Sequence, residues 1–315
     1  MKNVYSNIYY LDKTILKKTI RLLEQNNVVG LPTETVYGLA GNAYSKNAIK
    51  KIFKFKKRPS HNPLIIHYNN LKDARQDVIF NKSFLKLYKK FCPGPLTFVL
   101  KKKTKSKISS LATANLNTVA IRFPNHKIIK NILKSIDSPL AMPSANISSG
   151  LSPISALDVF KEFKKKLKII IDGGESKVGI ESTVIDLCSK PRILRPGVII
   201  ERDIRKVLKV NLSKKNLKLR SPGMMRKHYS PGIPVILGQK PKSSSHAYIV
   251  FGKKYKNIKN YFNLSKKANL KEAAANLYKI MRKIKDKGYK KIYVSKIPKT
   301  GPGFAINDRL RRASK

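Results

Sequence analysis

The sequence predicts an α/β protein that consists of two units joined by a polar linker. Residues 30–68 read as an apolar strand, a Thr- and Gly-rich turn, an amphipathic helix and a second buried strand. Residues 235–315 carry strand, helix, strand and helix in that order, which is typical of a small parallel α/β domain. Residues 211–234 are polar and contain several prolines and glycines, so they predict a linker. We therefore expect one domain over 1–210 and a smaller one over 235–315.

The elements of the first unit follow from local signals. Residues 12–27 predict an amphipathic helix because their apolar side chains form one stripe, and residues 28–31 form the end of an apolar strand. Ser45 is the expected N-cap of the next helix, whose apolar residues recur three or four positions apart. This helix ends before Pro59, because proline disfavours helical geometry in the residue ahead of it. Residues 64–67 then close the unit as a buried strand.

Short helices and strands alternate over the rest of the chain. The expected helices are 71–75, 83–91, 125–135, 154–166, 270–287 and 306–313, and the expected strands are 96–100, 119–124, 169–171, 193–197, 248–251 and 292–294. Residues 101–107 predict a solvated basic loop, and residues 140–153, rich in small residues and hydroxyls, predict another loop. Asp172, Gly173 and Gly174 predict a turn that leads into a hairpin-like return over 179–186.

Basic residues outnumber acidic ones by 68 to 17, which gives a formal net charge of +51. Such an excess favours anionic partners such as nucleotides, RNA or an acidic membrane. The lysines are spread through almost every segment, which is more typical of a general compositional bias than of one nucleic-acid-binding stripe. We therefore give the charge little weight as evidence for RNA binding.

The cysteine usage and the hydropathy predict a cytoplasmic protein. Cys92 and Cys188 are the only cysteines and lie far apart, which suits a reducing compartment without disulfides. The N-terminal residues have no apolar signal-peptide core, and no apolar run approaches the ~20 residues that a membrane span needs.

Several familiar catalytic motifs are absent from the sequence. It contains no GxxxxGK[ST] phosphate-binding loop and no GxGxxG after a strand. It has no HExxH, no His and carboxylate cluster with metal-ligand spacing, and no GxSxG nucleophile elbow. An enzyme with this sequence would therefore work by positioning and electrostatics rather than through a covalent nucleophile, and we predict no protein-bound metal.

The candidate site residues are hydrogen-bond donors and cations in loops and at strand ends. They suit a ligand with several negative charges, because arginine binds carboxylate or phosphate bidentately and lysine supplies a compact charge. The set is Thr35, Lys56, Arg58, Asn62, His67, Thr118, Arg122, Ser144, Asn146, Ser152, Ser182 and Arg195. Simpler interpretations exist: the arginines could pair with surface acids, the hydroxyls could cap helices, and His67 could be a satisfied core histidine. From spacing alone, both interpretations stay open.

Many segments resemble the motifs of one protein family, in the order expected for that family. They read PTETVYGL, KKRPSHNPL, PGPLTFVL, TVAIRFP, MPSANISSG, GIESTVIDL, LRPGVI, GMMRKHYSP, KEAAANLYKIMRK and FAINDRLRRA. Together with a histidine in the strand that follows KKRPSHNPL, they resemble the long, two-domain form of threonylcarbamoyl-AMP synthase, which begins with a YrdC-type domain. The family signature KxR followed by SxN is present as Lys56, Arg58, Ser144 and Asn146. Lys57 stands where many members have glycine, which adds a charge beside the signature.

The resemblance implies a fold and a reaction. The fold is a twisted mixed sheet with a concave basic face, followed by a small Rossmann-like domain and connected by a linker over 211–234. The reaction is the synthesis of L-threonylcarbamoyl-adenylate and pyrophosphate from L-threonine, bicarbonate and ATP. Mg²⁺ would be held mainly by the phosphates. The implied partners are the transferase complex that modifies the adenosine beside the anticodon in ANN-reading tRNAs and, as a further candidate, tRNA itself.

The resemblance also implies roles for single residues. Lys56, Arg58, Ser144 and Asn146 would form the catalytic signature. Threonine would be held by Thr35, His67, Arg122, Met142 and Ser182, with Arg122 on its carboxylate. ATP would be held by Lys56, Arg58, Asn62, Thr118, Ser144, Ser152, Arg195, His228 and Tyr229, the last two coming from the linker as it folds back over the nucleotide.

Two other functions fit parts of the sequence. The net charge and the basic loop at 101–107 would suit a non-catalytic RNA-binding protein, but the aromatic residues are not interleaved with cations in a stacking platform. A carbamoyl transferase acting on another protein would share the YrdC-type pocket. It would also need zinc-finger and acylphosphatase-like domains, which this sequence does not contain.

Overall fold

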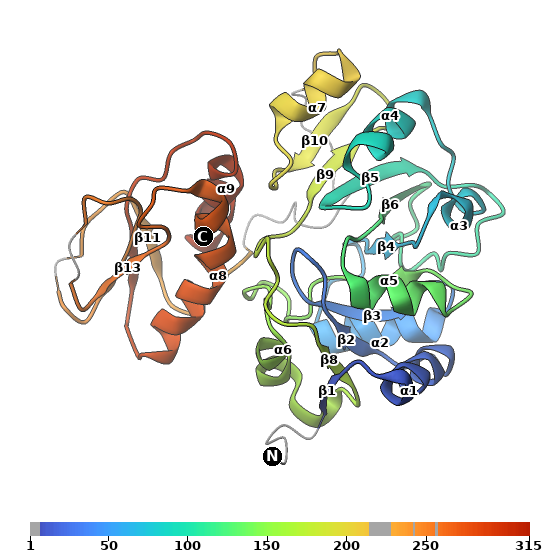
Figure 1. Ribbon diagram of the computed structural model, residues 1–315, viewed down its shortest axis with the longest axis horizontal. Helices are drawn as coiled ribbons and strands as arrows, with labels where there is room; N and C mark the ends of the chain where they lie inside the picture. The colour runs from blue at the N-terminus through green and yellow to red at the C-terminus, as the bar shows by residue number, and fades with distance from the viewer. Residues whose placement is uncertain (1–6, 214–227, 242, 256–257) are drawn as a thin grey trace.

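Two β-sheets organise the chain, and each belongs to one of the two parts seen in Figure 1. The computed structural model describes residues 7–213, 228–241, 243–255 and 258–315. The larger part holds a mixed sheet with helices, and the smaller part holds a parallel sheet with two long helices. The predicted α/β class and its two sheets are confirmed.

The first sheet mixes parallel and antiparallel neighbours in the order β1-β8-β2-β3-β7-β4-β6-β5-β9-β10. Its strands are β1 Ile8–Tyr10, β2 Val29–Leu31, β3 Gly38–Asn42, β4 Ile65–His67, β5 Leu96–Lys101, β6 Thr118–Arg122, β7 Leu140–Ala141, β8 Ile170–Asp172, β9 Thr183–Asp186 and β10 Arg192–Arg195. The central β4 pairs in parallel with β6 and antiparallel with β7, which places His67 opposite both Arg122 and Leu140.

The helices around this sheet start where the sequence places polar caps. They are α1 Lys13–Glu24, α2 Lys46–Lys56, α3 Leu71–Arg75, α4 Lys82–Phe91, α5 Lys127–Lys134, α6 Ala156–Phe163, followed by a 3₁₀ turn over Lys164–Lys166, and α7 Glu201–Leu208. The side chains of Asp12, Ser45, Asn81 and Ser155 each accept a hydrogen bond from the backbone of the first helical turn. The predicted N-cap at Ser45 is therefore confirmed.

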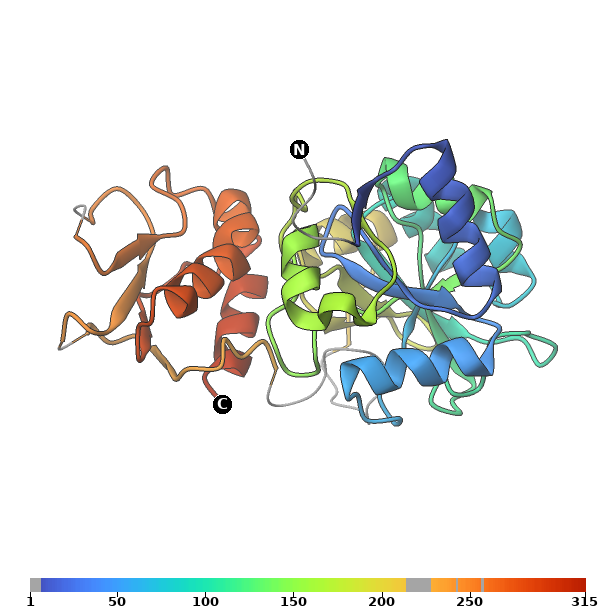
Figure 2. The same ribbon diagram turned by 90° about the horizontal axis from the view of Figure 1, so that it is seen from below.

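The two faces of the sheet are covered to different extents. One face packs against α2, α4, α6 and α7 and forms the main apolar core. On the other face, α1 and α5 cover the half that contains β2, β3, β7 and β8. Figure 2 shows α1 and α2 on opposite sides of the sheet. The other half of the second face carries a small apolar cluster of Ile65, Val99, Ala120 and Val184, and none of the described helices packs on it.

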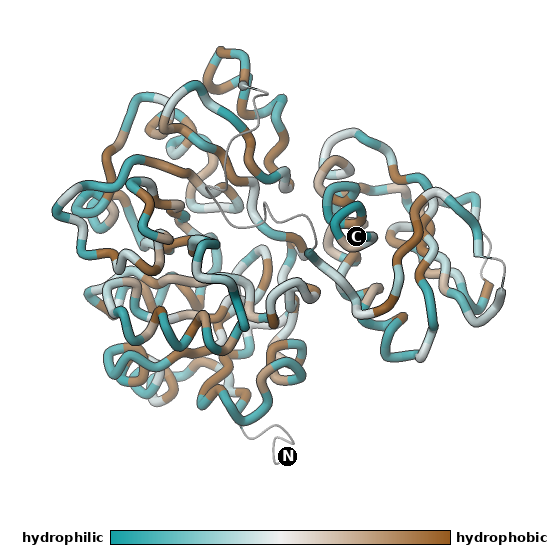
Figure 3. The backbone as a smooth tube through the Cα atoms, turned by 180° about the vertical axis from the view of Figure 1, so that it is seen from behind, coloured by the Kyte–Doolittle hydropathy of each residue, from teal (hydrophilic) through white to brown (hydrophobic). Residues whose placement is uncertain are grey.

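The second sheet is parallel throughout, in the order β11-β14-β12-β13. Its elements are β11 Val235–Leu237, β12 Ala247–Val250, β13 Tyr261–Asn263, α8 Leu270–Asp286, β14 Ile292–Val294 and α9 Gly303–Ala313. Figures 1 and 2 both place α8 and α9 between this sheet and the larger part. Figure 3 shows apolar strand segments inside each part and hydrophilic loops around them.

The core of the smaller part continues into the larger part. Val36, Leu151, Ile154 and Ile180 are buried in the same apolar cluster as residues of α8, α9 and the second sheet. Apolar packing therefore joins the two parts, in addition to the polar contacts described below.

The structure corrects the hairpin-like return and the start of the loop predicted over 140–153, where β7 pairs with β3 and β4, and it adds elements that were not expected. The hairpin-like return over 172–186 is wrong, because β8 pairs with β1 and β2 whereas β9 pairs with β5 and β10. The chain between β8 and β9 instead bonds to other loops, through the amides of Ser176 and Val178. Strands β1, β3, β7, β11 and β13 and helix α7 were not predicted.

Strand β3 reads GLAGN, a composition that rarely forms strands. Its glycine is needed for packing, because a Cβ on Gly38 would lie 2.3 Å from the Met142 side chain.

The predicted linker at 211–234 lies largely outside the described residues, although His228 and Tyr229 are described. Across the described residues, no helix combines the length and the hydropathy that a membrane span requires.

Candidate active site

A polar pocket lies on the half of the sheet that the helices leave open. It is lined by Thr35, Val36, Arg58, Ile65, His67, Arg122, Met142, Pro143, Ser144, Glu181, Ser182, Arg195, His228 and Tyr229. Seven of these residues belong to the candidate set, and three more, Met142, His228 and Tyr229, are among those that the family resemblance added. They come from segments spread over 35–229 of the chain. Strand alternation explains part of this, since His67 and Arg122 share a face with the apolar cluster of Ile65 and Ala120.

Arg122 is held at one end of the pocket by two neighbours from the turn after β2. One of its terminal nitrogens donates to Thr35 Oγ1 at 2.8 Å, and the other lies 2.7 Å from Glu34 Oε1. Thr33 fixes this turn, because its hydroxyl bonds to Thr35 Oγ1 at 2.9 Å and donates to the Val36 carbonyl at 2.6 Å. Glu34 was not among the predicted site residues, because an anionic ligand favours hydrogen-bond donors and cations over carboxylates.

His67 is buried beside Arg122 and is uncharged at neutral pH. Burial, and then the nearby Arg122 cation, lower the pKa of His67 to about 3. A neutral imidazole can both donate and accept a hydrogen bond, which suits a polar ligand better than a free cation would.

Two arginines in the pocket, Arg58 and Arg195, are held by hydrogen bonds to oxygens that carry no charge. Helix α2 is followed by Lys57 in a left-handed conformation at φ 48°, and the chain then turns. The turn lets the Arg58 guanidinium donate to the carbonyls of Asn62 and Pro63 and to the Asn62 side chain. Arg195 bonds to the carbonyl and the hydroxyl of Ser182, both at 3.1 Å. Among the described residues, no carboxylate forms an ion pair with either arginine.

Burial and the proximity of the two arginines affect their pKa values. Burial, and then Arg195, lower the pKa of Arg58 to about 9, and burial lowers the pKa of Arg195 as well. Both guanidinium groups stay charged at neutral pH, so the pocket holds two cations close together in the absence of a ligand.

Four of the predicted residues form a supporting layer rather than the pocket wall. Lys56 is buried and donates to the carbonyls of Ser144 at 2.5 Å and Asn146 at 2.6 Å. Asn146 accepts from the Ser144 hydroxyl at 2.6 Å and donates to two carbonyls of its own loop. Asn62 orients Arg58, and Ser152 donates to Glu181. Burial, and then Arg58, lower the pKa of Lys56 well below its usual value.

Glu181 connects the pocket to the smaller part of the molecule. Its carboxylate accepts from Tyr278 Oη at 3.1 Å and pairs with Arg309 Nε at 2.9 Å, so side chains of α8 and α9 reach it directly. Burial alone would raise the pKa of Glu181, but Arg309 and then Arg195 outweigh burial and hold that pKa at about 2. Sequence reasoning missed this cluster, although GIESTVIDL and FAINDRLRRA contain both charged partners.

His228 and Tyr229 cover the pocket from the smaller part. The two rings lie 4.1 Å apart, Tyr229 stacks on Tyr278 at 5.9 Å, and the Arg309 guanidinium lies 5.1 Å from the Tyr229 ring. Burial lowers the pKa of His228 to about 3, against the opposing effect of Glu181. The cavity left beneath these rings measures about 50 Å³, room for only one or two waters.

Thr118 lies apart from the pocket, at the opposite end of β6 from Arg122. It borders a groove formed by Lys101, Lys102, Lys103, Thr104, Leu116, Asn117, Cys188, Ser189 and Ile79. Thr118 and Arg122 are four residues apart and therefore face the same side of the sheet, about 13 Å from each other. The apolar cluster of Ile65, Val99, Ala120 and Val184 has Cys188 packed against it, so it adjoins this groove.

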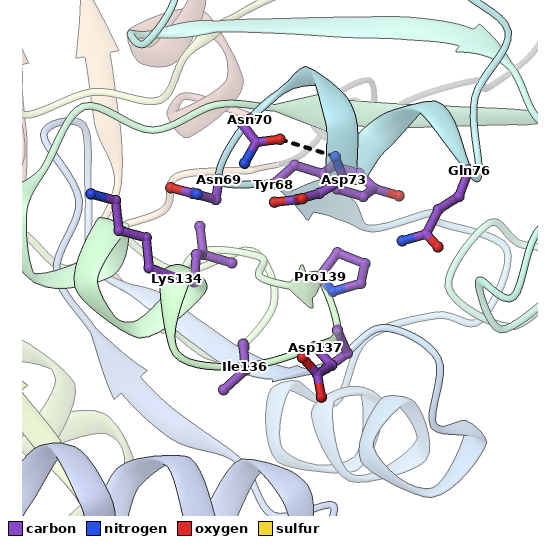
Figure 4. Close-up of a pocket in the computed structure, with 11 residues that line it drawn as sticks. Tyr68, Asn69, Asn70, Asp73, Gln76, Lys134, Ile136, Asp137 and Pro139 are labelled. Carbon is purple, nitrogen blue, oxygen red and sulfur yellow. Dashed lines mark hydrogen bonds between the residues drawn. The ribbon is translucent and has the colours of Figure 1, made fainter.

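Another pocket has the wrong chemistry for an anionic ligand (Figure 4). It measures about 320 Å³ and lies between the loop that begins α3 and the loop after α5. Asp73 and Asp137 line it, and Lys134 is the one cation among its lining residues. The Asp73 backbone is held by the Asn70 side chain at 3.0 Å. No cation cluster comparable to Arg58 and Arg195 is found there among the described residues.

Within the described ranges, no three His, Cys, Asp or Glu side chains come together as a metal site. The two carboxylates nearest the pocket, Glu34 and Glu181, are both engaged by arginines. Any divalent cation that accompanies a nucleotide would therefore depend on phosphate oxygens and water.

Comparison with known proteins gives the same picture for both parts of the chain. Residues 21–197 match the family Sua5_yciO_yrdC, described as "Telomere recombination", and residues 199–315 match "Threonylcarbamoyl-AMP synthase, C-terminal domain". The threonylcarbamoyl-AMP synthase of Pyrococcus abyssi is 36% identical over 93% of this chain and 92% of its own length. The Bacillus subtilis enzyme of that name is 34% identical over 93% of this chain and 91% of its own length.

A solved structure agrees over nearly the whole chain. The crystal structure of P. abyssi Sua5 complexed with L-threonine superposes with a TM-score of 0.88 at 34% identity, covering 98% of this chain and 96% of that one. The chain therefore belongs to the threonylcarbamoyl-AMP synthase family, ATP-using nucleotidyltransferases that make threonylcarbamoyl-adenylate for the threonylcarbamoyl modification of tRNA.

Proposed function

We propose that this chain forms L-threonylcarbamoyl-adenylate and pyrophosphate from L-threonine, bicarbonate and ATP, and that the pocket described above is where it does so. The product would pass to the transferase complex that modifies the adenosine beside the anticodon in ANN-reading tRNAs. Residues 1–210 would form the catalytic domain, 211–234 a linker that closes it and 235–315 a supporting domain. The relative that was crystallised with L-threonine supports the choice of amino acid.

Threonine would lie at the Arg122 end of the pocket. The guanidinium of Arg122 is held by Thr35 and Glu34, so it is already oriented to bind a carboxylate. His67 and Ser182 would bond to the remaining polar groups of the amino acid, and the Met142 backbone would accept from its amine. Neutral His67 is a suitable neighbour for an amine that must lose a proton before it reacts.

ATP would lie along the open half of the sheet. Its phosphates would meet Arg58, Arg195 and Ser144, and Lys56, Asn62, Asn146 and Ser152 would hold those groups in place. The adenosine would rest on the apolar cluster that leads toward Thr118, which supports a role for Thr118 at the far end of the nucleotide. Mg²⁺ would be held by phosphate oxygens and water, since both nearby carboxylates are engaged.

The reaction needs two anions to approach each other. The threonine amine attacks CO2 and releases a proton, or attacks bicarbonate and releases water, and either step gives a carbamate. A carbamate oxygen then attacks the α-phosphorus of ATP. The bond between that phosphorus and the bridging oxygen breaks, and pyrophosphate leaves. The pair Arg58 and Arg195 supports this proposal, because two neighbouring buried cations that form no ion pair with a described carboxylate are stabilised when an anion binds between them.

Closure of the pocket would protect the product. The remaining cavity of about 50 Å³ is too small for both substrates, so His228 and Tyr229 would have to move for ligands to enter. When the two rings return to their place over the nucleotide, they would exclude water from a labile adenylate.

Pyrophosphate release tests the proposal directly. We expect release from ATP to require both L-threonine and bicarbonate, and we expect threonylcarbamoyl-adenylate to appear in equal amount by mass spectrometry. Substituting L-serine and L-valine for threonine controls for the specificity of the amino-acid site. A purified protein that binds RNA in a salt-sensitive way but releases no pyrophosphate would contradict the proposal and favour a non-catalytic RNA-binding function.

A further inference from the structure

The face of the second sheet that points away from the larger part has a distinct composition. Helices α8 and α9 cover one face of this sheet, and Figures 1 and 2 show them on the side of the larger part. The opposite face, which we call the outer face, consists of Ile236, Tyr248, Val250, Tyr261 and Tyr293, with Tyr255 packed on it from the loop after β12. None of the described helices packs against the outer face.

The tyrosines of the outer face form one connected cluster. Tyr248 contacts Tyr261 edge-on at 5.1 Å between ring centroids and Tyr255 edge-on at 6.0 Å, while Tyr255 and Tyr261 lie 6.4 Å apart. Tyr293 extends the cluster and packs on His246 at 5.5 Å. Tyr248 and Tyr293 are buried at 4% and 9% exposure and so anchor the cluster, whereas Tyr255 and Tyr261 are only partly buried.

Lysines occupy the loops at the ends of these strands, whereas the acidic side chains of residues 235–315 are on the helices that cover the opposite face of the sheet. Residues 235–315 contain three acidic side chains, Glu272, Asp286 and Asp308, all on α8 or α9. Each of them is engaged, by Ser265, Lys161 and Arg309 respectively. The loops at the two ends of the strands carry exposed lysines at positions 240, 253, 254, 259, 290, 291 and 296. Lys254 lies 5.3 Å from the ring centroid of Tyr255.

The distribution of charged residues between the two faces of the second sheet is more informative than the net charge of the chain. Lysines are common throughout this chain, so an excess of them identifies no site. On the outer face, however, Lys254 lies beside the partly buried ring of Tyr255, further exposed lysines occupy the loops at both ends of the strands, and every acidic side chain of residues 235–315 is on α8 or α9. Strands β12, β13 and β14 bring Tyr248, Tyr261 and Tyr293 together on this face, although the three residues are far apart in the sequence.

We propose that the outer face binds a single-stranded segment of RNA. Unpaired bases would stack on Tyr255 and Tyr261, and the surrounding lysines would contact the phosphates. Flat aromatic rings with nearby cations are what unpaired nucleotides require, since every base has a face that stacks and every linkage carries a charge. An acidic peptide would match the lysines but would leave the tyrosine rings without a specific partner. This site is separate from the pocket for ATP and threonine and does not depend on the proposed function.

Binding of a short RNA hairpin with an unpaired loop tests the proposal. The full-length protein is titrated with the hairpin, with a fully paired duplex of equal length and with inorganic polyphosphate. Because stacking contributes ~1–3 kcal/mol per base, Tyr255→Ala and Tyr261→Ala should each weaken hairpin binding by about tenfold, or ~1.4 kcal/mol. Tyr255→Phe keeps the ring and should bind like the parent. Tyr10→Ala is the matched control, since Tyr10 is 76% exposed in the other part of the molecule.

The salt dependence separates phosphate contacts from general charge. Lys254→Gln should lower the slope of log K against log salt by about 0.7, whereas Lys271→Gln, on exposed α8, should leave the slope unchanged. Threonylcarbamoyl-adenylate synthesis should be the same in all these variants, which confirms that they are folded. The proposal is overturned if the duplex or polyphosphate binds as tightly as the hairpin, or if Tyr255→Ala and Tyr10→Ala have equal effects. It is also overturned if Tyr255→Phe loses as much affinity as Tyr255→Ala.

Discussion

Replacing Arg309 with methionine should destabilise the protein by about 3–5 kcal/mol. Arg309 is 1% exposed and pairs at 2.9 Å with Glu181, whose side chain is 8% exposed. The substitution removes the ion-pair partner of a buried carboxylate, which keeps its hydrogen bonds from Ser152 and Tyr278 and the more distant Arg195 cation, and breaking one side of a buried ion pair costs about that much. It also removes the cation that lies 5.1 Å from the Tyr229 ring, a contact of ~0.5–2 kcal/mol.

Urea unfolding followed by circular dichroism measures the loss, with Arg311→Met as the matched control. Arg311 lies on the same helix, is 66% exposed and reaches Asp308 only at 3.9 Å, so its loss should cost less than ~1 kcal/mol. Adding Glu181→Gln to Arg309→Met removes the unpaired charge and should recover at least ~1 kcal/mol. The reasoning is wrong if Arg309→Met stays within ~1 kcal/mol of the parent, or if the second substitution makes the protein still less stable.

Three further predictions concern the pocket. Arg58→Ala should abolish pyrophosphate release while leaving the unfolding midpoint nearly unchanged. Arg202→Ala is the control, because Arg202 is exposed. Near-normal turnover of Arg58→Ala would contradict the assignment of Arg58 to the phosphates. Glu34→Gln should raise KM for threonine several-fold with little change in kcat, because Glu34 only orients Arg122; an effect confined to kcat would rule this out. Buried His67 and His228 each have a pKa of about 3 against 6.5 when unfolded, so the unfolded state binds more protons between these values. Unfolding free energy should therefore fall by ~1.4 kcal/mol per pH unit per histidine from pH 6.5 to 4.5, and a flat profile in that range would show that the histidines are not buried uncharged.

Much of the architecture could be predicted because it is encoded locally. The cap at Ser45, the amphipathic pattern of α8 and the alternation of strand and helix after residue 247 are all short-range signals, and the structure confirms those elements. Strand β3 was missed for a local reason as well. Its glycine and alanine content, required by the close approach of the Met142 side chain to Gly38, hides the strand from propensity arguments.

The pocket shows the limit of sequence reasoning more clearly. Motifs brought together the donors that line it, but they gave no reason to choose Glu34 or Glu181, whose partners are known only from the fold. The Glu181–Arg309 pair spans 128 positions of the chain, and nothing at either position signals the other. The same holds for Lys56, which looks like a ligand-binding cation in the sequence but donates to two carbonyls beneath the pocket.

The apolar cluster shared by the two parts has a thermodynamic consequence. Val36, Leu151, Ile154 and Ile180 are buried in one apolar cluster with side chains of α8 and α9, so the two parts share this portion of their interior. A chain that ended before the second sheet would lose those contacts and expose apolar surface at these four residues, which favours aggregation. Scanning calorimetry of the intact protein should accordingly record one heat-absorption peak instead of two, since the two parts should unfold in a single cooperative transition.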